Sequence, residues 1–428
     1  MKLLVITYSF PPATTPRAYR WGSLVEYWGA QGHEVDVVTS RVENLSSVQY
    51  SGKVGVFRCF SLSSTGSLLK SRLSVQKSNS YKANLKQFVL NILKSLHSNT
   101  VRVIRWPDYA CTWLIPAVWR ALRLMSTRDY DAFISVSHPF TGHLVGWLVH
   151  WFFPKKHWMV DIGDPFALFE EIPQNNLKLY RRLNYFIERQ IITAASSLSV
   201  TTEGTRLAYK KAFPNIQKEY VVIPPLIGVA QQESKAKSNS DGVINLVYQG
   251  TLYRELRNPR GMLQTLNVLV RNSSLKFRLH LYGQINDCQP VLDEFQHLIG
   301  NNIALHGSVS KSLANEAMQN ADVLINIGNK TSYQLPSKIV DYMALGKPIL
   351  NFASVRPDSS EEVLREYTRS LTFHDGDWAD KKKIEKLEKF LLDPPPIPAQ
   401  DLAKILAKFR IEHIAQKYVS LIDAKHHG

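Results

Sequence analysis

The order of the first forty residues limits what this chain can fold into. An apolar run of strand length, LLVITY (residues 3–8), is followed by a turn-rich stretch and a helical pattern from about Pro16 to Gln31. Gly32 ends that helix, and a second apolar run, EVDVVT (34–39), follows at once. Proline just inside the start of a helix and glycine just after its end are typical. The strand, helix and strand form a βαβ unit, so the sequence predicts a parallel sheet and not a leader segment at this end.

The same alternation continues along the chain and starts again after a polar stretch, QQESKAKSNSD (231–241). We expect the further strands of the first half at 131–137, 158–161, 198–201 and 220–223. The second half is expected to contain strands at 244–248, 277–282, 303–306, 323–327 and 348–352, with helices at 261–270, 313–320 and 337–345. Two alternating halves predict an α/β protein with two doubly wound, Rossmann-like domains. The expected parts are a first domain (1–228), a linker (229–241), a second domain (242–399) and a C-terminal helix (400–428) that packs back across both lobes.

Composition excludes several other classes of protein. With 44% hydrophobic and 21% charged residues, the chain is not of the disordered type. Its three cysteines lie far apart, which excludes a disulfide framework or a structural zinc site and indicates a reducing compartment. The longest apolar window, from Phe140 to Phe153, is too short to span a bilayer. It is expected to be a buried helix, and a helix that touches a membrane face is the alternative.

The positive charge is concentrated in the first half. Residues 1–228 contain 27 basic and 14 acidic residues, and ten basic residues without any acidic one lie between Lys53 and Arg105. Four tryptophans, Trp106, Trp113, Trp119 and Trp147, follow closely. Such a one-sided charge suits a polyanionic partner: a nucleic acid, an anionic membrane or a phosphorylated substrate. No zinc-finger spacing, aromatic RNA-binding motif or basic recognition helix is present, so nucleic acid is not expected.

The most specific stretch of the sequence is LPSKIVDYMALGKPIL (335–350). Ser337 stands where it could cap a helix, and Gly346 stands where that helix should end. A helix N-terminus suits an anion such as a diphosphate, and Lys338 adds a cation in the first turn. Asp341 lies one turn later, where its carboxylate could accept hydrogen bonds from ribose. The alternative is a plain capped helix in which Asp341 stabilises the helix dipole.

This stretch resembles the donor-site helix of GT-B glycosyltransferases, in particular the retaining family-4 type. Other stretches are similar to that family in the same order: YSFPP (8–12), GHEV (32–35), GTLY (250–253), RNP (257–259), LYG (281–283), HGSV (306–309) and NADV (320–323). The resemblance spans most of the chain. It implies a GT-B fold, in which two Rossmann-like domains face a cleft.

The resemblance also implies a donor site for a nucleotide-diphosphate sugar in the second domain, with no metal ion or other cofactor. In that family a basic pair binds the diphosphate; Arg257 and Lys338 fit best here, with Arg254 as a rival and Ser337 beside them. Cations suit this chemistry because negative charge grows on the departing diphosphate. The residues expected around the nucleoside and sugar are Gly250, Thr251, Tyr253, Tyr282, Gly283, Tyr333, Leu335, Pro336 and Asp341. The sequence also contains no convincing metal-binding group such as HxH or DxD.

Two departures from the family pattern concern the sugar. Many members have two glutamates separated by seven residues, and here those positions are Tyr333 and Asp341. A tyrosine cannot act as a carboxylate, so the identity of the donor sugar stays open. The glycine-rich first loop of many members is replaced by ATTPR (13–17), which is stiffer and contains a cation.

Asp161 and Asp164, in MVDIGDPF (159–166), are the candidate catalytic residues, because they follow a strand of the first domain. A carboxylate beside an anomeric carbon can stabilise the developing positive charge or orient an acceptor hydroxyl. Asp164 is preferred, and its structural alternative is a turn before Pro165. The residues expected on the acceptor side are Pro12, Thr15, Arg17 and His138, although His138 could equally be structural.

The sequence and its resemblance to GT-B glycosyltransferases therefore predict a cytoplasmic, metal-independent glycosyltransferase of surface polysaccharide synthesis, and the resemblance implies that transfer retains the anomeric configuration. It would transfer a sugar to a saccharide or lipid-linked acceptor, and its basic first domain would touch an anionic membrane. Two alternatives remain: a GT-B nucleotide-sugar epimerase, and an inactive GT-B protein that binds or scaffolds.

Overall fold

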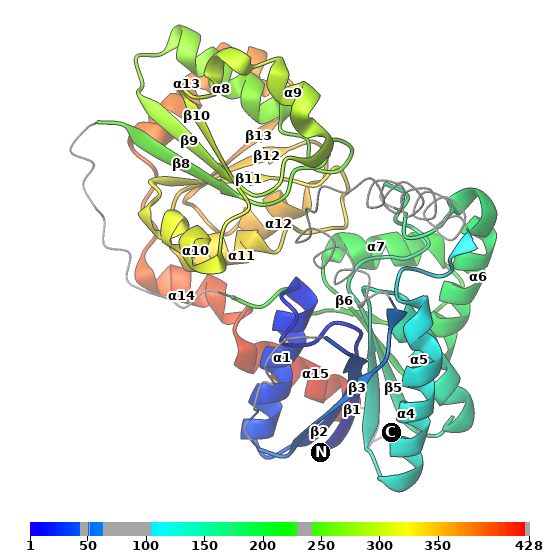
Figure 1. Cartoon of the computed structure of the whole chain (residues 1–428). Helices are drawn as coiled ribbons and strands as arrows, with labels where there is room; N and C mark the ends of the chain where they lie inside the picture. The colour runs from blue at the N-terminus through cyan, green and yellow to red at the C-terminus, as the bar shows by residue number, and fades with distance from the viewer. Residues whose placement is uncertain (43–49, 51, 63–103, 172, 229–241, 424–428) are drawn as a thin grey trace, which may run out of the picture. The chain divides into compact units, whose positions relative to one another are not determined.

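The computed structural model describes the chain except residues 43–49, 51, 63–103, 172, 229–241 and 424–428. The predicted linker and most of the basic stretch between Lys53 and Arg105 lie outside the described residues. The chain divides into two compact units. The first comprises residues 1–201, 206–223 and 415–428, and the second comprises residues 202–205 and 224–414. Each unit contains one sheet with helices on both faces (Figure 1).

The first unit is built on a seven-stranded sheet in the order β3-β2-β1-β4-β5-β6-β7, with every neighbouring pair parallel. Its strands are β1 (Lys2–Ile6), β2 (Glu34–Ser40), β3 (Val54–Cys59), β4 (Ala132–Val136), β5 (His157–Ile162), β6 (Ser197–Val200) and β7 (Tyr220–Val222). Its helices are α1 (Pro16–Ala30), α4 (Leu114–Thr127), α5 (Thr141–Phe152), α6 (Leu177–Ala194), and most of α7 (Glu203–Ala212) and α15 (Ile411–Asp423).

Helices α4, α5 and α6 cover one face of this sheet, and α1 and α15 cover the other (Figure 1). Because both faces are covered, the central strands are buried along nearly their whole length, as parallel strands require. The strand order changes direction between β1 and β4, so the loops after these two strands diverge to opposite faces. Ligands of doubly wound sheets bind at such a switch point.

The second unit is built on a six-stranded parallel sheet in the order β10-β9-β8-β11-β12-β13. Its strands are β8 (Ile244–Gln249), β9 (Phe277–Tyr282), β10 (Ile303–Gly307), β11 (Val323–Ile327), β12 (Ile349–Ala353) and β13 (Ser370–His374). Its helices are α8 (Arg260–Asn272), α9 (Gln289–Asp293), α10 (Lys311–Asn320), α11 (Lys338–Ala344), α12 (Ser359–Leu364), α13 (Lys381–Leu392) and α14 (Ala399–Ala407). Helices α8, α9 and α13 cover one face and α10, α11 and α14 the other (Figure 1). The switch point of this sheet lies between β8 and β11.

The predicted strands, and the predicted helices before residue 399, are confirmed, with small shifts at their ends. The apolar window at residues 140–153 forms α5, which is buried except at its end, where Trp151 and Phe152 are exposed. No helix among the described residues is long and apolar enough to cross a bilayer.

The prediction of a single C-terminal helix over residues 400–428 is wrong for its described part, which ends at residue 423. The chain leaves the helix at residues 408–410, between α14 and α15. Phe409 is buried in the core of the second unit, and its carbonyl accepts a hydrogen bond from the Ile227 N–H at 3.2 Å. That carbonyl would serve the helix itself if the helix continued.

Candidate functional site

The loops that follow β8, β9 and β10 lie side by side at the carboxyl edge of the second sheet. Hydrogen bonds join the Gly250 N–H to the Tyr282 carbonyl at 2.9 Å, and the Gly283 N–H to the Gly307 carbonyl at 2.8 Å. Gly283 has a φ of +132°, and a Cβ there would lie 2.0 Å from the Gly250 carbonyl oxygen. Only glycine fits this position, which lets the two loops approach closely.

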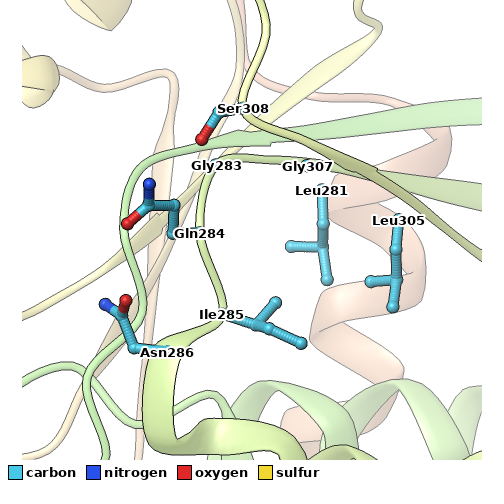
Figure 2. Close-up of a pocket in the computed structure, with 8 residues that line it drawn as sticks. All are labelled: Leu281, Gly283, Gln284, Ile285, Asn286, Leu305, Gly307 and Ser308. Carbon is cyan, nitrogen blue, oxygen red and sulfur yellow. The ribbon is translucent and has the colours of Figure 1, made fainter. Parts of the chain in front are cut away.

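A cavity of about 340 Å³ opens at this edge, between the ends of β9 and β10. Figure 2 shows the apolar side chains of Leu281, Ile285 and Leu305 on one side, and the polar side chains of Gln284, Asn286 and Ser308 on the other. Gly283 and Gly307 complete the lining. A mixture of apolar surface with a few polar groups is typical of small-molecule sites. Of these residues, only Gly283 was predicted to bind the donor.

The loop after β8 brings Arg257 to the switch point of the sheet. Main-chain hydrogen bonds in both directions between Tyr253 and Arg257, at 3.2 and 2.8 Å, close this loop. The half-buried Arg257 guanidinium donates two hydrogen bonds to the Asn329 side-chain oxygen and one to the Thr251 carbonyl. Asn329 follows β11, the strand beside β8. The predicted donor residue Arg257 is therefore rigidly oriented at the edge where doubly wound sheets bind ligands.

The two other arginines of this region differ from Arg257. Arg254 is exposed, and its main-chain N–H donates to the Asp287 carboxylate at 3.0 Å. Arg260, at the start of α8, forms a two-pronged ion pair with Glu294. Tyr253 is 40% exposed beside Arg254. Of these three arginines, Arg257 is therefore the one whose guanidinium is fixed at the switch point of the sheet.

The short helix α11 supplies Lys338 and Asp341. The Lys338 ammonium lies 3.8 Å from one Asp341 oxygen, and burial lowers the pKa of Lys338. The predicted capping role of Ser337 is wrong, because Ser337 has helical backbone angles and its side chain makes no capping bond. The Tyr342 hydroxyl accepts a hydrogen bond from the Gln249 N–H at 3.1 Å, which ties α11 to the end of β8.

Asp341 is buried and accepts a hydrogen bond from the Gly228 N–H at 2.7 Å. One Asp341 oxygen is therefore occupied by the main chain at Gly228, near the start of the second unit. Its predicted role toward ribose stays a prediction, as do the roles of Leu335 and the buried Pro336. The carbonyl of Tyr333 accepts the hydroxyls of Thr202 and Thr205, at 2.6 and 2.8 Å, so hydrogen bonds anchor the main chain of this residue.

In the first unit, Asp161 lies in β5 with only 1% of its surface exposed. Its carboxylate accepts hydrogen bonds from Ser199 and Tyr418, both at 2.7 Å, and from Arg17 at 3.1 Å. These bonds tie β5, β6, α1 and α15 together. The catalytic role predicted for Asp161 is untested, but the geometry gives the residue a clear structural task.

Asp164 is half-buried in the turn after β5, and the Arg17 guanidinium fills the space beside the preceding Gly163. Glu188 of α6, which the sequence analysis missed, accepts the N–H groups of Phe166 and Ala167 at 3.1 and 2.8 Å. Burial raises the pKa of Glu188. This carboxylate holds the loop that contains Asp164.

The predicted acceptor-side residues occupy the loops after β1 and β4, at the switch point of the first sheet. Thr15 caps α1 by accepting the Ala18 N–H at 3.1 Å, and Pro12 precedes it. His138 is half-buried, with its ring 5.6 Å from that of Tyr109. No group of three or more His, Cys, Asp or Glu side chains in the described part of the chain could hold a metal ion.

Comparison with known proteins connects this geometry to a family. Residues 244–390, which form most of the second unit, match the family described as "Glycosyl transferases group 1". No match was found among curated proteins.

Three solved structures resemble the whole chain. Sucrose-phosphate synthase from Thermosynechococcus elongatus has a TM-score of 0.62 at 14% identity, covering 100% of this chain and 99% of that one. The lipopolysaccharide outer core galactosyltransferase WaaB, in its apo form, has a TM-score of 0.60 at 12% identity, with 99% and 100% covered. A trehalose-6-phosphate protein from E. coli, bound with UDP-2-fluoro glucose, has a TM-score of 0.61 at 12% identity, with 99% of both chains covered. At these identities the likeness concerns the fold, and it confirms the predicted GT-B architecture of two Rossmann-like domains.

Proposed function

We propose that this protein is a glycosyltransferase that uses a nucleotide-diphosphate sugar as its donor. One observation carries the proposal: Arg257 is fixed at the switch point of a domain that matches the glycosyl transferases group 1 family. The cavity between β9 and β10 lies beside the same loop, because the Asn286 side chain donates to the Leu252 carbonyl at 2.8 Å. A structural neighbour that was solved with UDP-2-fluoro glucose supports this class of donor.

In the proposed reaction, Arg257 and Lys338 stabilise the nucleoside diphosphate as it leaves the sugar. Negative charge grows on the leaving group as the glycosidic bond breaks, and fixed cations stabilise that charge most in the transition state. We assign this task to the two side chains without a metal ion or other cofactor. The site for the nucleoside and the sugar would be lined by Gly250, Thr251, Tyr282 and Gly283.

We assign the acceptor to the first unit. Asp164 would face the transferred sugar or the acceptor hydroxyl, and Arg17 and His138 would contact the acceptor. The acceptor we propose is a saccharide, free or linked to a lipid, in surface polysaccharide synthesis, and we propose that transfer retains the anomeric configuration, as in family 4.

The test is to measure turnover of nucleotide sugars by three single variants. Arg257→Ala and Lys338→Ala should each lose at least about 100-fold in turnover, the usual effect of removing a group that stabilises transition-state charge. Arg260→Ala is the matched control, because Arg260 lies three residues from Arg257 but pairs with Glu294. Wild-type turnover in both Arg257→Ala and Lys338→Ala would remove the assignment.

Product analysis separates this function from its alternatives. An epimerase would change the nucleotide sugar in the absence of any acceptor, whereas a glycosyltransferase needs one. An inactive scaffold protein would give no turnover, and it would give no heat with a nucleoside diphosphate in calorimetry if the donor site were also lost.

We also propose that the first unit rests on an anionic membrane at the cytoplasmic face. Trp119 of α4 is 57% exposed, and the guanidinium groups of Arg120 and Arg123 lie 5.5 and 5.6 Å from its ring. At the end of α5, which packs against α4, Trp151 and Phe152 are 60% and 66% exposed. Exposed aromatic rings among arginines suit the headgroup region of an anionic bilayer.

A further inference from the structure

Asn329 holds the Arg257 guanidinium through a single oxygen. The Asn329 side-chain oxygen accepts from Nε at 3.0 Å and from Nη2 at 2.8 Å. Its amide nitrogen donates to the carbonyl and the side-chain oxygen of Gln334, both at 3.2 Å. This arrangement fixes which end of the amide faces the arginine, because a flipped amide would point N–H groups at N–H groups. Asn329 is 1% exposed, so the orientation is held by its surroundings.

Within the described part of the chain, every group that holds Arg257 by a hydrogen bond is uncharged. Besides Asn329, the guanidinium donates to the Thr251 carbonyl at 3.3 Å, and it lies near the Tyr248 hydroxyl. Among the described residues, no carboxylate forms an ion pair with Arg257, whereas Arg17, Arg128 and Arg260 each have one. Neutral acceptors fix the direction of a guanidinium and leave its charge uncompensated. A carboxylate in the place of Asn329 would fix it equally well but cancel that charge.

We propose that Asn329 is a positioning residue that presents the uncompensated charge of Arg257 to the diphosphate of the donor. This inference rests on the proposed function. It explains why the loops after β8 and β11, which meet at the switch point, are joined by an amide and not by an ion pair. It also explains how a half-buried arginine keeps one orientation before the donor arrives, so that binding does not have to order it.

Asn329→Asp tests the proposal, because it keeps the shape and the oxygen that faces Arg257 but adds a negative charge. It also loses the donor to Gln334, a loss that Asn329→Ala shares. We measure the affinities of UDP, GDP, ADP and dTDP, of the matching nucleosides, and of inorganic pyrophosphate as a competitor, each at two salt concentrations. Asn329→Asp should weaken nucleoside diphosphate and pyrophosphate binding by about 10- to 100-fold and flatten the salt dependence, with the nucleoside unchanged. Asn329→Ala, which loosens Arg257 but keeps its charge, should weaken diphosphate binding by only about 3- to 10-fold and keep the salt dependence.

A purely structural role for Asn329 predicts a different pattern. Both variants would then lose nucleoside and diphosphate binding together, in proportion to their loss of melting temperature, and that result would refute the proposal. Gln334→Ala provides a further variant if Asn329→Asp does not fold; it removes one of the two acceptors of the Asn329 amide nitrogen, keeps the main-chain carbonyl, and should weaken diphosphate binding by no more than Asn329→Ala does, with nucleoside binding unchanged. If a nucleoside diphosphate binds the wild type and Asn329→Asp equally, only the role of Asn329 is refuted. If none binds the wild type, the proposed function fails, and the role of Asn329 fails with it.

Discussion

Replacing Tyr418 with phenylalanine should destabilise the first unit far more than the loss of one hydroxyl usually does. The Tyr418 hydroxyl donates to Asp161 at 2.7 Å and accepts from Arg20 at 2.9 Å, and the side chain is fully buried. Burial raises the pKa of Tyr418, so the hydroxyl keeps the proton that it donates. Tyr418 belongs to α15, whereas Arg20 and Asp161 belong to α1 and β5. One oxygen atom therefore joins the end of the chain to its first half.

The structure allows the cost to be worked out. Tyr418→Phe removes two hydrogen bonds to charged groups, each worth about 1.5–3 kcal/mol. Neither partner is left alone, because Asp161 keeps Ser199 at 2.7 Å and Arg20 keeps the Ile223 carbonyl at 3.1 Å. The phenylalanine ring still packs against Trp21 and Trp28. The two bonds together amount to about 3–6 kcal/mol, and because both partners keep another bond we expect the free energy of unfolding to fall by less, about 2–4 kcal/mol.

Urea unfolding followed by tryptophan fluorescence measures this loss. Eight of the nine tryptophans lie within residues 1–201, so the signal reports on the first unit. The control is Tyr27→Phe, which removes a hydroxyl of α1 that bonds no described residue. A loss below about 0.5 kcal/mol in Tyr418→Phe, or a loss equal to that of the control, would refute the argument, because surface substitutions fall in that range.

Three further predictions concern other residues. Burial lowers the pKa of His143 to about 3, whereas the same side chain in the unfolded chain takes up a proton near pH 6.5. The free energy of unfolding should therefore fall by roughly 3 kcal/mol between pH 7 and pH 4, and by less in His143→Gln. Urea unfolding at both pH values measures the difference. Lys338→Met should abolish donor turnover. Because it removes a half-buried ammonium group, the free energy of unfolding should stay unchanged or rise by less than about 1 kcal/mol. A clear loss of stability would contradict this prediction. Trp119→Ser combined with Trp151→Ser should weaken sedimentation with phosphatidylglycerol vesicles by about tenfold, and equal binding would argue against the membrane face.

The strand and helix pattern could be predicted because it depends on local sequence. Buried parallel strands are mostly apolar runs, and LLVITY and VLINI needed no partner to be recognised. Two of the four edge strands, β3 and β13, were missed for the same reason. β3, with Gly55 and Arg58, is half-exposed along most of its length, and β13 buries only alternate residues. Neither has the uninterrupted apolar run that identified the central strands.

The site could be predicted only in part, because its geometry depends on contacts far apart in sequence. Arg257 was identified from the loop in which it stands, but its partner Asn329 lies 72 residues away and belongs to no motif. Glu188 likewise meets the loop of Asp164 from a separate helix. The signal that could have found Asn329 is topological: in a doubly wound sheet, the loops after the two strands at the switch point are neighbours.

Each of the two sheets has an arginine after its first strand, beside the switch point, but only one of the two arginines is paired with a carboxylate. Arg17 follows β1, beside the switch point of the first sheet, and Asp161 neutralises it at 3.1 Å. Arg257 follows β8, beside the switch point of the second sheet, and the groups that hold it in the described structure are neutral. Arg17→Ala should therefore leave pyrophosphate affinity unchanged while lowering stability, because it removes one partner of a buried carboxylate. Arg257→Ala should weaken pyrophosphate binding and leave the stability unchanged. A loss of pyrophosphate binding in Arg17→Ala would show that the ion pair with Asp161 does not neutralise the charge of Arg17.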